Sequence, residues 1–192
     1  EGVFADCTNL ESVTIPESVT EIGEGAFENT PWLKALGDFA VVNHILLRYQ
    51  GVEKDVTTPA GGVTEIGAGA FFGCMDLESV TLPEGVTKIG TGAFGKCKGL
   101  EDVTVPASVT TIDAYAFYCC INLEHVTIPE GVTSIGKGAF SCTSLQSVTI
   151  PASVTEIEWD AFDSCWEMEE IILPQSLAGQ RFSNHNFKCL IV

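Results

Sequence analysis

The sequence predicts a repeat solenoid, in which one short unit is wound repeatedly around a single core. Two observations lead to this prediction: prolines and Ala-Phe pairs return at a fixed interval, and each unit holds a short stretch of alternating apolar and polar residues. The prolines stand 23, 23, 22 and 23 residues apart, at Pro83, Pro106, Pro129, Pro151 and Pro174. A fixed period between about 20 and 29 residues, with apolar residues at constant offsets, is typical of solenoids.

Each unit is predicted to begin with a short strand. In the unit at residues 77–97, Val80 and Leu82 alternate with polar residues, a period of two that leaves one face buried. Pro83 has no N–H and ends the strand. The stretch 86–90 is too short for a helix, so its Val and Ile are predicted to form the opposite wall of the core. Residues 93–97 are predicted to form a single helical turn with Phe94 at the centre of the coil.

Stacking of such coils explains how the chain builds a core. Equivalent strands are expected to lie in parallel, about 4.8 Å apart, so that like residues form ladders of Phe on Phe and Val on Val. No coil can bury its apolar face alone, and its neighbours supply the missing wall.

We expect one solenoid domain over residues 1–192, with two departures from the period. Pro16 and Pro59 are 43 residues apart, 20 more than one coil, and an inserted segment is predicted at 30–58. Within it, two apolar runs flank Asn43 and His44, which predicts a β-hairpin of structural rather than ligand-binding role. After Pro174 the pattern degenerates, so residues 175–192 are predicted to be a capping coil, with truncation of a longer array as the alternative.

Composition excludes several classes of function. The 26 acidic and 9 basic residues give a formal charge of −17, which disfavours binding to nucleic acid or to an anionic membrane surface. No apolar run approaches the roughly 18 residues of a membrane-spanning helix, so no membrane insertion is expected. The chain opens in the middle of a unit, and we therefore expect it to be part of a longer protein.

Eight cysteines recur at nearly regular positions and are predicted to be buried structural thiols. Five of them lie three residues after the repeated Phe, at Cys7, Cys74, Cys97, Cys120 and Cys165. Cys142 and Cys189 lie two residues after it, and Cys119 is interpreted as the one outside this ladder. Parallel Cβ vectors disfavour disulfides between coils, although one or two remain an alternative, and no Cys/His spacing indicates zinc.

The sequence shows no arrangement of residues for catalysis. A catalytic triad needs converging groups of different types, whereas a solenoid offers rows of similar ones, and the Ile-Gly-x-Gly-Ala-Phe stretches lack the Lys of a phosphate-binding loop. We expect no enzyme activity, no cofactor and no metal.

The unit L-E-x-V-T-I-P-x-[SG]-V-T-x-I-G-x-G-A-F-x-x-C resembles the BspA-type leucine-rich repeat of bacterial cell-surface proteins. About seven such repeats of 23 residues cover nearly the whole chain. The resemblance implies a right-handed superhelix with a parallel sheet on its concave side. It also implies an extracellular or cell-surface location in a bacterium, and a role in adhesion or protein binding.

The exposed face of the predicted strand ladder holds the candidate binding residues. The position before the repeated Val changes from coil to coil, whereas the position after it is almost always Thr. The candidates are Ser79, Thr81, Asp102, Thr104, His125, Thr127 and Ser147. Asp102 and His125 stand at the centre of the row, and a merely solvated face is the alternative.

The leading hypothesis is therefore a non-catalytic module that binds a protein or an extracellular-matrix partner. The alternative is a spacer or stalk that displays another domain and binds nothing itself. Open ends of a solenoid expose strand edges, so end-to-end self-association is also expected to be possible.

Overall fold

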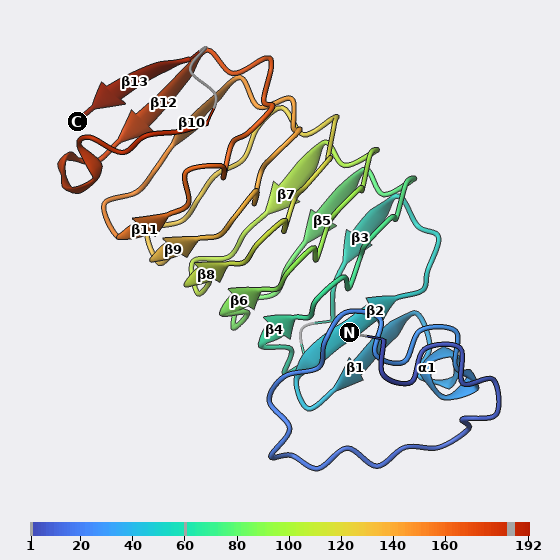
Figure 1. Cartoon of the computed structure of the whole chain (residues 1–192). Helices are drawn as coiled ribbons and strands as arrows, with labels where there is room; N and C mark the ends of the chain where they lie inside the picture. The colour runs from blue at the N-terminus through green and yellow to red at the C-terminus, as the bar shows by residue number, and fades with distance from the viewer. Residues whose placement is uncertain (1, 60, 184–186) are drawn as a thin grey trace.

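The computed structural model describes residues 2–59, 61–183 and 187–192 and shows a β-solenoid built mainly from short parallel strands (Figure 1). Strands lie on two opposite sides of the stack, and four of the coils contribute one strand to each side: β3 and β4, β5 and β6, β7 and β8, and β10 and β11 (Figure 1). The predicted fold class is confirmed.

One side of the stack is a seven-stranded sheet in the order β1-β2-β4-β6-β8-β9-β11. Five of its members are two-residue strands from the second Val-Thr segment of successive coils. They are β4 (Glu65–Ile66), β6 (Lys88–Ile89), β8 (Thr111–Ile112), β9 (Ser134–Ile135) and β11 (Glu156–Ile157). Ile89 pairs in register with Ile66 and Ile112, and all three side chains are fully buried. The segment predicted only as a wall of the core is thus a parallel sheet.

The other side consists of two three-stranded sheets. The first is β3 (Asp55–Thr57), β5 (Ser79–Thr81) and β7 (Asp102–Thr104), and the second is β10 (Ser147–Thr149), β12 (Glu170–Leu173) and β13 (Lys188–Ile191). Val56, Val80 and Val103 align across the first sheet and point into the core. These strands occupy the positions that the alternating pattern predicts.

A column of stacked phenylalanines fills the centre of the coils. Consecutive rings from Phe71 to Phe162 lie 4.8–5.4 Å apart between centroids and within 14° of parallel. All five side chains of this column are at most 1% exposed: Phe71, Phe94, Phe117, Phe140 and Phe162. Offset stacking at this spacing adds to the free energy gained by burial, and the predicted Phe ladder is confirmed.

The predicted single helical turn around Phe94 is wrong. Residues 91–96 form successive tight turns, with Gly92 and Lys96 both at φ near +60°. Alternate N–H groups bond within the coil and across it: Ala93 N donates to Gly90 O at 3.1 Å, and Phe94 N to Ala116 O at 2.7 Å. Phe94 N and Lys96 N both donate to carbonyls of the next coil, so hydrogen bonds between coils decide the geometry here.

The inserted segment contains the predicted hairpin and a helix that the sequence analysis missed. β1 (Phe39–Val42) and β2 (Ile45–Tyr49) pair antiparallel around Asn43 and His44, which take φ of 49° and 67°. α1 (Pro31–Ala35) precedes them, with the Thr30 hydroxyl accepting from Leu33 N at 3.1 Å as a helix cap. Because β2 pairs in parallel with β4, the hairpin continues the seven-stranded sheet.

The C-terminal residues form η1 (Gln175–Leu177) and the edge strand β13. Phe182 and Phe187 are buried and extend the aromatic contacts beyond Phe162, although their rings are tilted rather than stacked. All four residues of β13 are exposed.

Candidate functional site

The predicted binding residues on regular strands lie on one outward-facing surface, which we call the strand face. Ser79 of β5 pairs with Asp102 of β7, and Thr81 pairs with Thr104, while the valines between them point inward. Ser79 is half-buried and its hydroxyl donates to Asp55 Oδ1 at 2.6 Å, whereas Asp102 is exposed. Ser147, on β10, belongs to the second three-stranded sheet.

The prediction of a strand at His125 is wrong. Residues 123–129 have no strand assignment, and the strand face is divided there between β7 and β10. The turn from Phe140 to Leu145 is one residue shorter than that from Phe117 to Leu123, which also explains the 22-residue interval between Pro129 and Pro151. This difference of one residue accompanies the break in pairing, and among the described residues β10 pairs with β12 but not with residues 125–127.

A hollow of about 570 Å³ lies at this division. It is bounded by residues 125–130 of one coil and by residues 147–149 and Pro151 of the next. The structure thus brings together three of the predicted site residues, His125, Thr127 and Ser147, around one concavity. The other four, Ser79, Thr81, Asp102 and Thr104, lie on the neighbouring sheet and do not line it.

Two further hollows, which the sequence analysis missed, lie where the inserted segment interrupts the stack. Their volumes are about 170 and 380 Å³, and they share Glu28, Leu33 and Arg48 in their walls. Arg48 Nη1 donates to Gly69 O at 2.9 Å and is therefore held in place. The only available signal was the 43-residue interval between Pro16 and Pro59, which locates the interruption but not the side chains around it.

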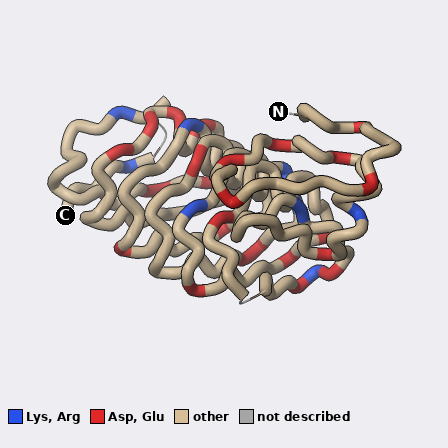
Figure 2. Tube along the Cα trace, turned by 90° about the horizontal axis from the view of Figure 1, so that it is seen from below, with Lys and Arg blue, Asp and Glu red and all other residues tan. Residues whose placement is uncertain are grey.

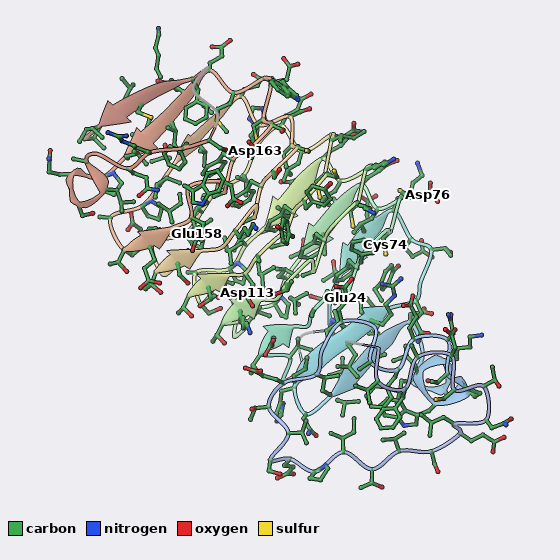
Figure 3. All side chains as sticks on the ribbon, in the orientation of Figure 1. Glu24, Cys74, Asp76, Asp113, Glu158 and Asp163 are labelled. Carbon is green, nitrogen blue, oxygen red and sulfur yellow. The ribbon has the colours of Figure 1, made fainter. Side chains whose placement is uncertain are left out.

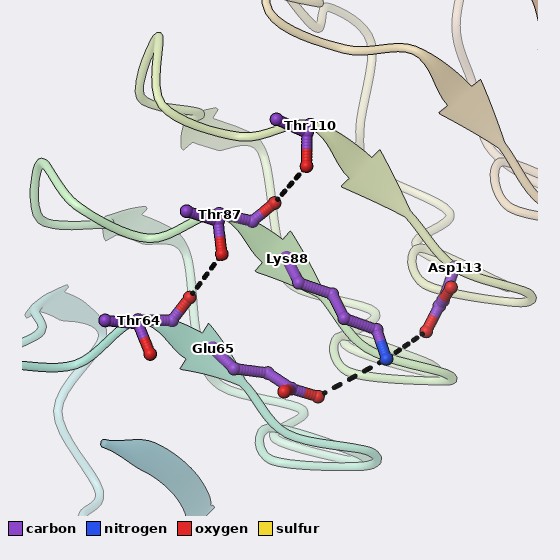
Figure 4. A network of polar contacts seen from close by, with 6 residues as sticks. All are labelled: Thr64, Glu65, Thr87, Lys88, Thr110 and Asp113. Carbon is purple, nitrogen blue, oxygen red and sulfur yellow. Dashed lines mark hydrogen bonds and ion pairs between the residues drawn. The ribbon is translucent and has the colours of Figure 1, made fainter. Parts of the chain in front are cut away.

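The surface charge is spread along the stack rather than gathered in one patch (Figure 2). Asp113 and Glu158, which follow β8 and β11 directly, are labelled in Figure 3 among these acids. Burial raises the pKa of Glu65 on β4, and the neighbouring Lys88 opposes that rise. Figure 4 shows the contacts: Lys88 Nζ lies 3.5 Å from Glu65 Oε1 and 3.1 Å from Asp113 Oδ2, linking three coils.

A row of threonines runs beside this ion-pair network. Thr87 Oγ1 donates to Thr64 O at 3.2 Å, and Thr110 Oγ1 donates to Thr87 O at 3.1 Å (Figure 4). The same contact continues from Thr133 to Thr110 and from Thr155 to Thr133. Since each hydroxyl bonds a carbonyl of the preceding coil, this row contributes to stacking and is occupied by its own partners.

The cysteines form two columns rather than one. In the first, three residues after the repeated Phe, the buried thiols of Cys97, Cys120 and Cys165 donate to Phe carbonyls of the coil before, at 3.0–3.1 Å. Burial raises the pKa of Cys120 to about 12, so these thiols stay protonated and behave as small apolar groups. In the coil of Phe140, Thr143 occupies the position three residues after Phe, and its hydroxyl lies 3.3 Å from Cys165 Sγ.

The second column, two residues after Phe, contains Cys119 and Cys142. The interpretation of Cys119 as the cysteine outside the ladder is therefore wrong, because it shares its position with Cys142 in the next coil. Both side chains are half-buried, as is Cys74 of the first column, whereas Cys97, Cys120 and Cys165 are buried. Cys7 and Cys189 are exposed, so burial predicted for every cysteine is also wrong.

Within residues 2–59, 61–183 and 187–192, no three His, Cys, Asp or Glu side chains are grouped so that they would hold a metal ion. In the same part of the chain, no helix has the length and apolar character needed to cross a bilayer.

Several solved structures are similar to this chain. A leucine-rich repeat protein of T. pallidum is 32% identical, with a TM-score of 0.68 over 76% of this chain and 72% of that one. A leucine-rich cell-surface protein of Faecalibacterium prausnitzii is 31% identical, with a TM-score of 0.50 over 67% of this chain and 50% of that one.

The pneumococcal vaccine antigen PcpA shares the fold at 24% identity. Its TM-score is 0.70, and the match covers all of this chain but only 53% of that one. No curated protein matches the chain.

The family description "BspA type Leucine rich repeat region" matches residues 1–40 and 64–189, in six copies where the spacing predicts about seven. The interval left between the two matched parts, residues 41–63, overlaps the inserted segment that breaks the 23-residue period and extends beyond its predicted end at residue 58. The chain belongs to the BspA-type leucine-rich repeat family.

Proposed function

We propose that this chain is a non-catalytic binding module of a bacterial cell-surface protein, and that it recognises a protein or extracellular-matrix partner through its strand face. Leucine-rich repeat proteins commonly bind other proteins, and the F. prausnitzii structure is described as a cell-surface protein. Residues 1–192 would act as one unit, with 30–58 as an insertion and 175–192 as the final coil.

The hollow between residues 125–130 and β10 is the observation that supports this proposal. Rows of like residues make most of the solenoid surface uniform, and a partner needs a place where neighbouring coils differ. At the hollow, an exposed imidazole, hydroxyls and the Glu130 carboxylate come together beside Pro129 and Pro151. Asp102, next to it on β7, adds a negative charge that favours a partner with basic side chains.

A capture experiment tests the proposal. The purified chain is passed over immobilised extracellular-matrix and serum proteins, and a double Asp102→Ala, His125→Ala variant is compared with it. We expect at least a tenfold loss of affinity in the double variant. The matched control is Thr111→Ala with Ser134→Ala, two half-buried polar positions on the opposite sheet, which should bind as the unmodified chain does.

Equal capture by both double variants would remove the strand face as the binding site. Absence of capture from every immobilised protein would favour the spacer hypothesis. Hydrolysis of a peptide or glycan by the purified chain would contradict the non-catalytic assignment.

A further inference from the structure

Two cysteines occupy the same position in neighbouring coils. Cys119 and Cys142 each lie two residues after the repeated Phe, and both take the left-handed conformation, with φ of 57° and 59°. Lys96 and Ser164 occupy this position in the flanking coils with φ of 60° and 57°. The backbone geometry is therefore repeated from coil to coil, and only these two adjacent coils place thiols on it.

Backbone hydrogen bonds hold the two turns against each other. Cys119 N donates to Ser141 O at 2.9 Å, and Cys142 N donates onward to Asp163 O at 2.9 Å. Neighbouring rungs of such a ladder lie about 4.8 Å apart, which falls inside the Cα range of about 4.4–6.8 Å found in disulfides. Burial raises the pKa of the Cys142 thiol, and the nearby Cys119 thiol raises it further.

Among cysteines at the same repeat position in adjacent coils, Cys119 and Cys142 are the pair in which neither side chain is fully buried. Cys119 and Cys142 are both half-buried, so a small reagent can reach them. Cys74 and Cys97 also stand in neighbouring coils, but the Cys97 side chain is fully buried and its thiol donates to Phe71 O at 3.0 Å. A buried thiol with a carbonyl partner is a poor nucleophile.

We propose that Cys119 and Cys142 form a dithiol modification site, which a small-molecule disulfide converts into a cross-link between the two coils. The thiolate of one cysteine attacks the disulfide and releases one small thiolate, leaving a mixed disulfide. The second cysteine, as its thiolate, attacks the protein sulfur of that mixed disulfide and releases the other small thiolate. The two cysteines lose two protons and two electrons, and the reagent is reduced to two thiols.

The cross-link joins the two coils that bound the 570 Å³ hollow. Cys119 precedes residues 123–129, and Cys142 precedes β10. These two neighbouring segments of the strand face do not pair with each other. A covalent bond in the turns before them closes a loop of about one coil. The disulfide thereby links the two coils covalently through the turns that contain Cys119 and Cys142, where residues 123–129 and β10 lack strand pairing.

Peptide mapping tests the proposal. The folded, reduced chain is incubated with glutathione disulfide at pH 8, then alkylated and digested with trypsin without reduction. We expect peptides 99–137 and 138–181 to be recovered as one linked species. The link should disappear in Cys119→Ser and in Cys142→Ser, and persist in Cys120→Ala, the matched control next in sequence.

Two readouts keep the outcome independent of any folding defect in the variants. In the unmodified reduced chain, iodoacetamide should label Cys119 and Cys142 at least tenfold faster than Cys97 and Cys120. Cross-linking should also become faster between pH 7 and pH 9, because the thiolate is the nucleophile.

Recovery of Cys119 and Cys142 each bearing its own glutathione, without the linked peptide, would overturn the proposal. A link from Cys74 to Cys97 in its place, or equal labelling of all four cysteines, would do the same.

Discussion

Residues 10–27 and residues 77–94 follow the same repeat pattern, yet only the second stretch forms strands. Val80 is buried in β5, which is paired with β3 on one side and β7 on the other. Its counterpart Val13 is only half-buried, and residues 10–16 have no strand assignment. The residues are nearly the same in the two coils, and what differs is the neighbour.

The neighbour of the first coil is the inserted segment. Trp32 N donates to Leu10 O at 2.9 Å, and Asn43 Nδ2 donates to Pro16 O at 2.8 Å, so helix and hairpin contact this coil from one side. Phe27 and Trp32 anchor a small apolar cluster separate from the main core, whereas Tyr49 of the hairpin contacts Phe71 with its ring tilted by 30°. A repeat unit becomes a strand only when an equivalent unit lies beside it, as expected for a one-dimensional core.

The largest expected contrast concerns the aromatic column. Phe94→Ala removes a fully buried ring stacked between Phe71 and Phe117, and we expect it to lower the free energy of unfolding by about 3–5 kcal/mol. Phe4→Ala removes a ring that is 44% exposed, with an expected loss of at most about 1 kcal/mol. Urea unfolding monitored by circular dichroism measures both, and similar losses would mean that the first coil is as well packed as the central ones.

Amide hydrogen exchange should show the next largest contrast. Amides of β5 and β7 are bonded between coils, so we expect them to exchange at least about 100-fold more slowly than those of residues 12–14. Exchange followed by mass spectrometry or NMR in the native protein provides the comparison. Equal protection would show that residues 12–14 form a ladder in solution and would remove the distinction between the two regions.

Close approach between coils predicts a smaller effect at one glycine. A Cβ at Gly90 would lie 2.8 Å from Ile66 O and 3.0 Å from Ala68 N of the preceding coil, so Gly90→Ala should cost about 1–3 kcal/mol. Gly61 has no atom within 4 Å of such a Cβ, and Gly61→Ala is the matched control with little expected change. The shift in the urea midpoint measures both, and an unchanged midpoint for Gly90→Ala would show that the coils can separate at no cost.

The ion pairs across the opposite sheet should have the smallest effect, and one that depends on pH. Lys88→Met should cost at most about 1 kcal/mol at pH 7, because the pairs are partly solvated. Burial already raises the pKa of Glu65, and loss of Lys88 should raise it further. A raised pKa of Glu65 in the folded state stabilises the fold at low pH, and this stabilisation is lost as the pH rises through that pKa. When the pH is lowered from 7 to 4.5, the free energy of unfolding of the variant should therefore increase more, or decrease less, than that of the unmodified chain.

Urea midpoints at the two pH values measure this difference. Lys137→Met, at an exposed position in a turn, is the control and should show the pH dependence of the unmodified chain. The same pH dependence in Lys88→Met would argue against the role of Lys88 beside Glu65.

Much of the fold follows from local rules that can be applied to the sequence. The 23-residue period predicts stacked coils, Val80 and Leu82 predict a strand with one buried face, and the repeated Phe predicts the aromatic column. The hairpin around Asn43 and His44 could also be predicted, because both apolar runs and a two-residue turn are visible in the sequence.

The candidate site was predicted less well, and the reason lies in contacts between coils. His125 and Thr127 have the sequence of a strand, but residues 123–129 remain unpaired, so the hollow beside Ser147 has no counterpart in the repeat pattern. Arg48 and Glu28 come from different elements, and only the folded chain brings them to one cleft.

The sequence by itself determined which residues are directed toward the core, because Val, Ile and Phe recur at constant offsets in each unit. How completely each is buried depends on the neighbouring coil, as Val13 and Val80 show. The tertiary structure decided which units become strands and how the turns are bonded. It also gave Cys119 and Cys142, whose common spacing from Phe is visible in the sequence, the same left-handed backbone conformation in adjacent coils. The physical reason is that strands and turns here are completed by hydrogen bonds from neighbouring coils, and a single unit does not specify how its neighbour is placed.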